Sequence, residues 1–327
     1  MSQRPPKSAG WWPMIKVLPV QTNFRFMHLA WLWALLSGTA TVAAVFLTVW
    51  PFTPPCGGLN CGVDFRGGTV LELSSPRPID LERVRTTLSG IGMGDVQPQA
   101  FGSPNDAMVR FETPESANPA QAVESAKAEL VKALGPLTFK RTEVVGPKVS
   151  GELFRNGFLA LGLGVLMMMT YIWFRFGLTF GLGAAAALLH DVLLTFGLFA
   201  VTGMEFTLTS IAAILTIIGY SVNDTVVVLD RIRENLRKYK RMPLGQVIDL
   251  SINETLSRTA ITGVTGMMAL GVLAAFGGEA LFGFSVAMIF GIVVGTYSSF
   301  FVAASVLMGL GVRRGEEEAE PLKPARA

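Results

Sequence analysis

The sequence predicts an α-helical polytopic membrane protein with six transmembrane helices and one periplasmic α+β domain of ferredoxin-like (βαββαβ) plan. Half of the 327 residues are hydrophobic and 16% are charged, whereas soluble domains carry about 25% charged residues. Several apolar runs are long enough to cross a bilayer, and a segment with many charged and turn residues, 51–156, follows the first of them. These runs exclude a pair of soluble domains. The net charge of +3 is too small to indicate nucleic-acid binding.

A membrane-spanning helix needs about 20 mostly apolar residues. Six stretches meet this requirement: 28–50, 157–174, 179–201, 206–229, 259–276 and 281–312. The last is too long for one straight crossing, so we expect it to tilt or to project into water. The first lacks a small-residue cleavage site at Val49-Trp50-Pro51-Phe52, so we interpret it as an uncleaved anchor rather than a signal peptide.

The distribution of basic residues predicts the orientation. Lys and Arg precede the first span, lie between the fourth and fifth spans, and follow the last, whereas the links 202–205 and 277–280 carry none. Cytoplasmic loops are enriched in Lys and Arg, so we expect both termini in the cytoplasm. In a bacterium, the protein would then be a multi-pass protein of the cytoplasmic (inner) membrane with a periplasmic insert.

The expected organisation has five parts. They are a cytoplasmic N-terminus (1–27), a first transmembrane helix (28–50), a periplasmic α+β domain (51–156), a five-helix transmembrane region (157–312) and a cytoplasmic tail (313–327). Within the five-helix region, the segment 230–257 is both basic and amphipathic. Such helices lie along the headgroup boundary, and we expect this one on the cytoplasmic side.

The insert reads as four strands and two helices. Alternating apolar residues predict strands at 69–74, 96–101, 107–112 and 137–145, and the second and third strands flank a hairpin loop at 102–106. Asp80 is a candidate N-cap for a helix to about Ser89, and Asn118 or Pro119 opens a second helix through Ala133. The order β-α-β-β-α-β is the ferredoxin-like plan. That plan hosts many unrelated functions.

The insert carries no pattern typical of an enzyme. It has no histidine, no nucleophile elbow and no metal cluster, so we expect no catalytic residues, no cofactor and no metal. Cys56 and Cys61 are the only cysteines of the chain. They either form a small disulfide loop, which the compartment permits, or remain two thiols.

His190 and Asp191 lie halfway along the third predicted span. Ionisable residues in a bilayer are costly, and each is therefore a candidate for function. Asp191 is either a neutral, hydrogen-bonded structural acid or a proton carrier. Both readings fit the sequence.

A second polar cluster lies in the fourth span and consists of Tyr220, Ser221, Asn223, Asp224 and Thr225. Tyr220 and Ser221 precede Asp224 by four and three residues, so they share its helix face. Counted from residue 206, Asp224 is about 27 Å along the helix, which predicts a position near the cytoplasmic end. The cluster is dense enough to favour a path for water or protons over a simple interfacial cap.

Arg258 lies at the cytoplasmic mouth of the fifth span. The fourth and fifth spans are antiparallel, so Arg258 and Asp224 could lie at similar depth and pair. Alternatively, Arg258 extends to the headgroups as an anchor.

An intramembrane aspartyl protease is one competing hypothesis, because Asp191 and Asp224 lie on consecutive antiparallel spans. Their expected depths differ, and neither follows a Gly-x-Gly sequence. Both points argue against it.

Several motifs resemble those of the SecD/SecF family of the resistance–nodulation–division superfamily. The match runs from about residue 15 to 312, and its most specific block is Asn223-Asp224-Thr225 followed by Asp230-Arg231-Ile232-Arg233-Glu234. The other matching motifs are Gly62-Val63-Asp64-Phe65-Arg66-Gly67-Gly68-Thr69, Val145-Gly146-Pro147-Lys148-Val149-Ser150-Gly151, His190-Asp191 and Ser257-Arg258-Thr259. The single small insert resembles the SecF branch rather than the SecD branch.

The resemblance implies an accessory subunit of the Sec translocase. Such a subunit pairs with SecD, works with the SecYEG channel and YajC, and uses protons driven by the membrane gradient to promote late stages of preprotein export. An alternative is half of a proton-driven exporter of small molecules or lipids from the same superfamily, whose larger porter domains are missing here.

The resemblance also implies roles for individual residues. It maps proton movement onto Asp224 and Arg258, and Asp191 matches the family's His-Asp pair. We further expect two links to let the insert tilt relative to the bundle. Their residues are Gly62, Asp64, Gly67, Gly68, Gly146, Pro147 and Gly151.

Overall fold

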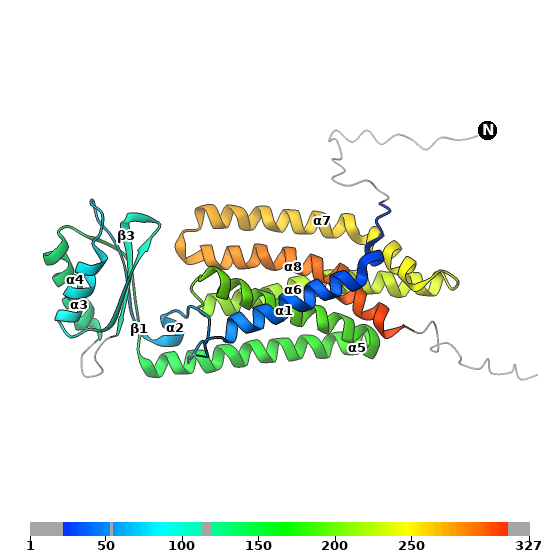
Figure 1. Cartoon of the computed structure of the whole chain (residues 1–327), viewed down its shortest axis with the longest axis horizontal. Helices are drawn as coiled ribbons and strands as arrows, with labels where there is room; N and C mark the ends of the chain where they lie inside the picture. Colours follow the sequence, from blue (N-terminus) through cyan, green and yellow to red (C-terminus); the bar gives the residue numbers. More distant parts are fainter. Residues whose placement is uncertain (1–21, 53–54, 113–118, 313–327) are drawn as a thin grey trace, which may run out of the picture.

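The computed structural model describes residues 22–52, 55–112 and 119–312. Long helices form a bundle, and a small α+β domain lies at one end of it (Figure 1). The expectations for most of the N-terminus, for the tail and for Asn118 as a helix cap fall on residues outside these ranges.

The bundle contains a short 3₁₀ helix, η1, and five long helices. They are η1 (Phe26–Leu29), α1 (Ala30–Val49), α5 (Pro147–Thr202), α6 (Leu208–Lys238), α7 (Leu244–Phe276) and α8 (Glu279–Leu310). Five helices of the described chain are long and apolar enough to cross a membrane. Half or more of the most apolar window is buried in α5, α6 and α8, against 11% in α1 and α7. The centre of the bundle is therefore made by α5, α6 and α8, with α1 and α7 at its surface.

Helix α5 contains both stretches expected as the second and third spans, 157–174 and 179–201. Its backbone leaves the helical conformation at Gly177 (φ 74°, ψ −179°). A Cβ placed on Gly181 would lie 3.4 Å from the Cα of Trp173, although eight residues of straight helix span about 12 Å. The chain therefore reverses at Gly177 and forms two limbs, 147–176 and 178–202.

The segment 230–257 differs from the single amphipathic helix that we expect from the sequence. Helix α6 continues to Lys238, and α7 begins at Leu244, before the apolar stretch 259–276. The two ends pack on each other: the amide of Asn235 donates to Ser251 at 3.0 Å and to Glu254 at 2.7 Å, and Glu254 also accepts from Arg231 at 2.7 Å. The packing of α6 on α7 thus continues, through polar contacts, beyond the apolar part of each helix.

The α+β domain has an antiparallel four-stranded sheet with two helices on one face. Its elements are β1 (Gly68–Ser74), α3 (Leu81–Gly90), β2 (Gly94–Phe101), β3 (Ser103–Glu112), α4 (Pro119–Leu134) and β4 (Thr138–Val145), and the strand order is β2-β3-β1-β4. Leu71, Leu73 and Val109 pack against Leu88 and Leu130 of the helices. The opposite face of the sheet has no helix of its own and is turned toward the bundle (Figure 1).

Local signals in this domain agree with the sequence except at one turn. Asp80 caps α3, as expected, and accepts from the backbone amides of Glu82 and Arg83. The hairpin is tighter than the expected five-residue loop, because β3 begins at Ser103 and Gly102 alone separates it from β2. Gly102 has φ 72°, a conformation that glycine adopts at little cost.

The reversal at Gly177 gives a stability prediction. Gly177→Ala should lower the free energy of unfolding by about 1–3 kcal/mol, because its φ and ψ lie in a region that only glycine adopts readily. Gly162→Ala is the matched control, since a Cβ there would meet nothing within 4 Å and alanine favours helix by up to about 1 kcal/mol. Thermal unfolding of both variants in detergent, followed by circular dichroism, measures the difference. Equal midpoints would contradict the reversal.

Candidate functional site

Asp191 joins three helices at the centre of the bundle. It lies in the second limb of α5 and is 1% exposed. Its Oδ2 accepts hydrogen bonds from the hydroxyls of Ser221 on α6 and Ser298 on α8, the latter at 2.8 Å. Its Oδ1 lies 3.0 Å from Nδ1 of His190. Burying a carboxyl group is costly unless it is hydrogen-bonded, and these neighbours supply the bonds.

Helix α8 contributes two serines that sequence reasoning leaves out of this site. Ser298 contacts Asp191, and the hydroxyl of Ser299 lies 2.8 Å from that of Thr225 on α6. The available signal is the run of hydroxyl residues 296–299 within an otherwise apolar helix. Such residues hydrogen-bond across membrane helices.

Small residues allow α6 and α8 to approach. A Cβ placed on Gly295 would lie 2.9 Å from Cβ of Ser221, which is closer than ordinary packing allows. Gly291, one turn earlier, faces Ile217 in the same way. Small residues at this spacing are typical of close helix contacts in membranes. Here they bring the Ser221 hydroxyl and Ser298 to the same carboxylate.

His190 and Tyr297 link the Asp191 cluster to α1. Its ring lies 6.0 Å from that of Tyr297, and the Tyr297 hydroxyl lies 2.8 Å from the hydroxyl of Ser37 on α1. The other ring nitrogen, Nε2, is buried and has no hydrogen-bond partner among the described residues. The cluster thus reaches every long helix except α7.

Asp224 lies on α6 and is 4% exposed. Its Oδ2 is buried without a hydrogen-bond partner in the described part of the chain, as are the hydroxyls of Tyr220 and Thr259. A Cβ on Gly263 of α7 would lie 3.9 Å from the Tyr220 hydroxyl. Tyr220 and Asp224 share one face of α6, as the sequence predicts, and Tyr220 on that face approaches α7.

Two residues of the expected site lie elsewhere. Asn223 is exposed on the outer side of α6, because one residue of helix rotates it by about 100° from Asp224. Arg258 is also exposed. Its charge is near enough to act on Asp224, but within the described ranges no ion pair joins the two side chains. Of the two alternatives for Arg258, the direct pair with Asp224 is therefore not formed.

Asp191 and Asp224 are closer in height than the sequence suggests. Asp191 is bonded to Ser221, which precedes Asp224 by three residues, or about 4.5 Å of helix. The two carboxyl groups are therefore closer along the bundle than the sequence predicts, and Asp224 lies near the middle of α6, which continues to Lys238. No hydrogen bond joins the two carboxyl groups in the described chain. The main argument against an intramembrane aspartyl protease is therefore that neither aspartate follows a Gly-x-Gly sequence.

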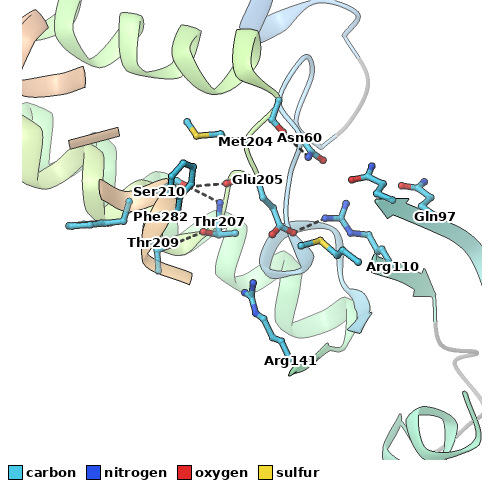
Figure 2. A pocket seen from close by; sticks show the side chains of 15 residues that line it. Asn60, Gln97, Arg110, Arg141, Met204, Glu205, Thr207, Thr209, Ser210 and Phe282 are labelled. Carbon is cyan, nitrogen blue, oxygen red and sulfur yellow. Dashed lines mark hydrogen bonds and ion pairs between the residues drawn. The ribbon is translucent and has the colours of Figure 1, made fainter. Parts of the chain in front are cut away.

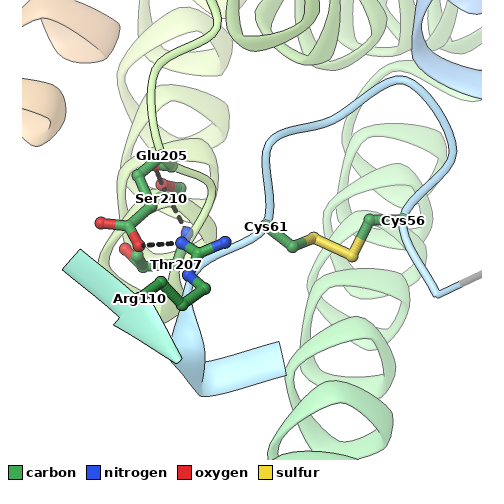
Figure 3. Close-up of a disulfide and its surroundings, with 6 residues drawn as sticks. All are labelled: Cys56, Cys61, Arg110, Glu205, Thr207 and Ser210. Atoms are coloured by element: carbon green, nitrogen blue, oxygen red, sulfur yellow. Dashed lines mark hydrogen bonds and ion pairs between the residues drawn. A yellow bond between two sulfur atoms is a disulfide. The ribbon is translucent and has the colours of Figure 1, made fainter. Parts of the chain in front are cut away.

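The α+β domain is docked on the loop between α5 and α6 (Figure 3). Phe206 of that loop exchanges backbone hydrogen bonds with Asn60 and Gly62, at 2.7 and 2.9 Å. Asp64 accepts from the backbone amide of Leu208 at 2.9 Å, at the first turn of α6. A carboxylate at this position satisfies a free amide and interacts favourably with the helix dipole.

A disulfide and an ion pair reinforce this junction. Cys56 and Cys61 are bonded, so the first of the two alternatives holds, and the short loop that they close carries Asn60. Arg110 of β3 forms a 2.7 Å ion pair with Glu205 of the α5–α6 loop. Figure 3 shows the ion pair beside the disulfide.

The residues of the expected links differ in conformation. Gly62 and Asp64 are fixed to the loop before α6. Gly62 precedes the four-residue helix α2 (Val63–Arg66), Asp64 lies within it, and Gly67 and Gly68 follow it. Gly67 and Gly68 have φ 74° and 99°. In the second link, Gly146 caps α5, Pro147 begins it, and Gly151 lies within it. Gly67 and Gly68 therefore have backbone conformations that favour glycine, Gly151 is an ordinary helical position, and a tilt of the domain at these links stays a prediction.

The fold and the buried carboxyl groups define a class, a multi-pass helical membrane protein with an appended α+β domain and an acidic site in its bundle. Among the described residues, no group of three or more His, Cys, Asp or Glu could hold a metal ion. The family model for the protein export membrane protein SecD/SecF, C-terminal, matches residues 126–313.

Named relatives agree with that match. The protein translocase subunit SecF of Rhodobacter capsulatus is 43% identical over 321 residues, which cover 94% of this chain and 95% of the relative. The same subunit of Rickettsia akari is 41% identical, covering 90% of this chain and 94% of the relative. The chain therefore belongs to the SecF branch of the SecD/SecF family, which indicates a role in Sec protein translocation.

Solved structures support the fold. The crystal structure of SecDF, a translocon-associated membrane protein from Thermus thermophilus, matches with a TM-score of 0.77 and 33% identity over 89% of this chain. SecDF in a super-membrane-facing form matches with a TM-score of 0.61 and 31% identity over 91% of this chain. The matches cover 39% and 40% of those chains, so this chain spans about two fifths of the solved relatives.

The Asp191 cluster gives a second prediction. Ser298→Ala should lower the free energy of unfolding by about 1.5–3 kcal/mol, because it removes a donor from a buried carboxylate. Ser285→Ala is the matched control, since Ser285 of the same helix is buried but bonds only to the carbonyl of Leu281. Unfolding in a mixed detergent–denaturant series measures both. Equal losses would show that Ser298 has no special role.

Proposed function

We propose that the chain is an accessory subunit of the Sec translocase that works with SecD and uses the proton motive force to promote late stages of preprotein translocation across the cytoplasmic membrane. The observation that carries this proposal is the buried Asp224 carboxyl group, with an oxygen that has no partner among the described residues. It lies beside the Asp191 cluster in a chain of the SecF branch. A carboxyl group held in a bundle without a fixed partner is suited to bind and release a proton.

The topology that we propose has six crossings. The two limbs of α5 would each cross the membrane, and α1, α6, α7 and α8 supply the other four. Both termini would then be cytoplasmic and the α+β domain periplasmic, which agrees with the basic residues after α6 and with the disulfide in the domain. The strand order, and the helices α3 and α4 that connect β1 to β2 and β3 to β4, support the ferredoxin-like plan for that domain.

The proposed partner is SecD, and the surface of the bundle supports it. Helix α7 exposes Ile261, Val264, Met268 and Val272, and Arg258 is exposed on the same helix. A charged residue within an apolar surface is costly in lipid alone. A partner helix that covers Arg258 would offset that cost. Contacts with SecYEG, YajC and the preprotein follow from the family and stay proposals.

In the proposed mechanism, Asp224 carries the proton and Arg258 tunes it. An ionised carboxylate in an apolar bundle is costly, and an approaching guanidinium offsets that cost. A movement of α7 that brings Arg258 toward Asp224 would favour release of the proton, and withdrawal would favour uptake. A potential of 100 mV supplies about 2.3 kcal/mol per charge moved across the membrane, which is enough to shift two packings of similar free energy.

The topology can be tested by labelling single cysteines in a variant without the native pair. Ser89 on α3 and Lys238 at the end of α6 are both exposed. An impermeant thiol reagent added to intact spheroplasts should modify Ser89→Cys only. Detergent permeabilisation is the control and should allow both sites to react. Modification of Lys238→Cys in intact spheroplasts would overturn the proposed orientation.

The proton mechanism gives a fourth prediction. Asp224→Asn keeps the shape of the side chain but cannot titrate, so gradient-dependent export should fall to the rate measured without a gradient. Arg258→Lys should reduce it partly, because lysine lacks the planar guanidinium. Thr216→Val is the control, since Thr216 is exposed on α6 and bonds only to its own helix. Preprotein export into vesicles carrying SecD measures all three. Full export by Asp224→Asn, with the gradient intact, returns this residue to a structural role.

A further inference from the structure

Two hollows lie at opposite ends of the bundle. One lies between the sheet and the bundle, where Arg110 reaches Glu205 and the two charges are paired within the chain (Figure 2). The other, of about 490 Å³, lies at the far end from the α+β domain, where the segment before α1 packs on α8. We call it the N-terminal hollow, and it is lined by Phe24, Arg25, Phe26, His28, Leu29, Trp33 and Phe301.

Helix α7 holds the backbone that forms this hollow. The side-chain amide of Asn253 donates to the carbonyl of Phe24 at 2.9 Å and accepts from the backbone amide of Phe24 at 3.0 Å. Asp249, one turn earlier on α7, accepts from the backbone amide of Met27 at 2.9 Å. Arg25 lies between these two anchored residues. Its position is therefore set by tertiary contacts of the fold.

Aromatic rings form one wall of the N-terminal hollow. The ring of Trp33 on α1 lies 4.5 Å from that of Phe301 on α8, and the ring of Phe26 lies 5.8 Å from the same phenylalanine. Phe24 and Leu29 continue the apolar lining and are 55% and 41% exposed. Water therefore meets a broad apolar surface here, and covering that surface with a hydrocarbon chain is favourable.

Arg25 and His28 carry polar groups at the edge of the aromatic wall. Both line the hollow and are exposed. The charge of Arg25 is near enough to act on Asp249, but Asp249 is bonded to the backbone amide of Met27, and in the described ranges no ion pair joins it to Arg25. A guanidinium and an imidazole N–H are both donors to phosphate oxygens. The edge of the hollow is thus suited to a phosphate group.

The length of α1 places these donors at the depth of lipid headgroups. Its 20 residues, Ala30–Val49, extend about 30 Å, which matches the thickness of the hydrocarbon core of a bilayer. Arg25 and His28 come just before this helix and therefore lie in the headgroup layer, whereas Trp33 lies one turn inside. Tryptophan is enriched at this interface, and basic pockets at this level bind the headgroups of anionic lipids.

We propose that the N-terminal hollow binds one anionic glycerophospholipid. Its phosphate accepts hydrogen bonds from Arg25 and His28, and one acyl chain lies over the aromatic wall. A free phosphate would leave that wall uncovered, and an apolar partner helix would leave Arg25 without an anion. The proposal needs α1 to cross the membrane, but it does not depend on the proton mechanism. Because Asn253 holds the same segment, the bound lipid also stabilises the contact of that segment with α7.

The test is photo-crosslinking of the full chain in proteoliposomes of phosphatidylethanolamine and phosphatidylglycerol, mixed three to one and with identical acyl chains. A photoreactive phenylalanine analogue replaces Leu29, which lines the hollow, or Trp31, which is 69% exposed on α1 outside it. Mass spectrometry of the crosslinked peptides identifies the headgroups. Adducts at Trp31 should follow the bulk lipid ratio. At Leu29, phosphatidylglycerol should be enriched about tenfold, because the ethanolamine cation of the other lipid weakens the pairing of its phosphate with Arg25.

Two arginine variants separate the hollow from the general attraction of basic residues for anionic lipid. Arg25→Gln should return the adducts at Leu29 to the bulk ratio, whereas Arg237→Gln should leave the enrichment unchanged. Arg237 is the matched control because it is exposed at the same end of the bundle, two residues after Asn235, which bonds to Ser251 of α7. A bulk ratio at Leu29 in the unaltered chain, or equal effects of the two variants, would overturn the inference.

Other occupants of the hollow would give different products. Crosslinking at Leu29 is repeated in native membranes, where a lipid adduct supports the site. A polypeptide adduct there in place of lipid would show that a partner or another part of this chain fills the hollow, and it would rule out the lipid. Loss of the enrichment in proteoliposomes on addition of inorganic phosphate would identify a site for a free anion only, with the same consequence.

Discussion

The buried carboxyl group of Asp191 sets the packing of the bundle. It accepts from Ser221 of α6 and Ser298 of α8 and lies beside His190 of its own helix. Without those donors, its burial would cost several kcal/mol. The donors reach it only because Gly295 lets α6 and α8 come together. Apolar packing alone would allow several relative rotations of these helices, whereas the hydrogen bonds to the carboxyl group allow only one.

Polar groups that need a hydrogen-bond partner also determine a contact at the N-terminal end of α6. The first turn of a helix leaves amides without partners, and Asp64 reaches from the α+β domain to satisfy that of Leu208. The position of the domain is thereby tied to the start of the helix that carries Ser221 and Asp224. The ion pair of Arg110 with Glu205 adds a second contact between the domain and the loop before α6. One helix thus connects the candidate proton site with the α+β domain.

Features of local sequence could be predicted, and features of side-chain partnership could not. The strand 69–74 and the cap at Asp80 follow from alternation and capping chemistry and are confirmed. Ser298 has only the hydroxyl run 296–299 as a signal, and that run does not identify its partner, because a serine in an apolar helix is equally compatible with a bond to its own backbone. Asp224 lies near the middle of α6 and not near its end, because the end of an apolar run need not be the end of a helix: α6 continues to Lys238, and Asn235 in this last part bonds to α7.

Arg258 shows why a site of this kind stays incomplete in one chain. It is exposed on α7, near enough to Asp224 to act through its charge but without an ion pair to it. A fixed pair would hold Asp224 ionised, and a distant cation would leave it unaffected. In the proposed mechanism, this intermediate position would make the protonation of Asp224 depend on small movements of α7, a helix of which 11% of the apolar window is buried within this chain. A partner that covers α7 would then act on the charge of Asp224 and, through α6, on the α+β domain that Asp64 connects to the start of that helix.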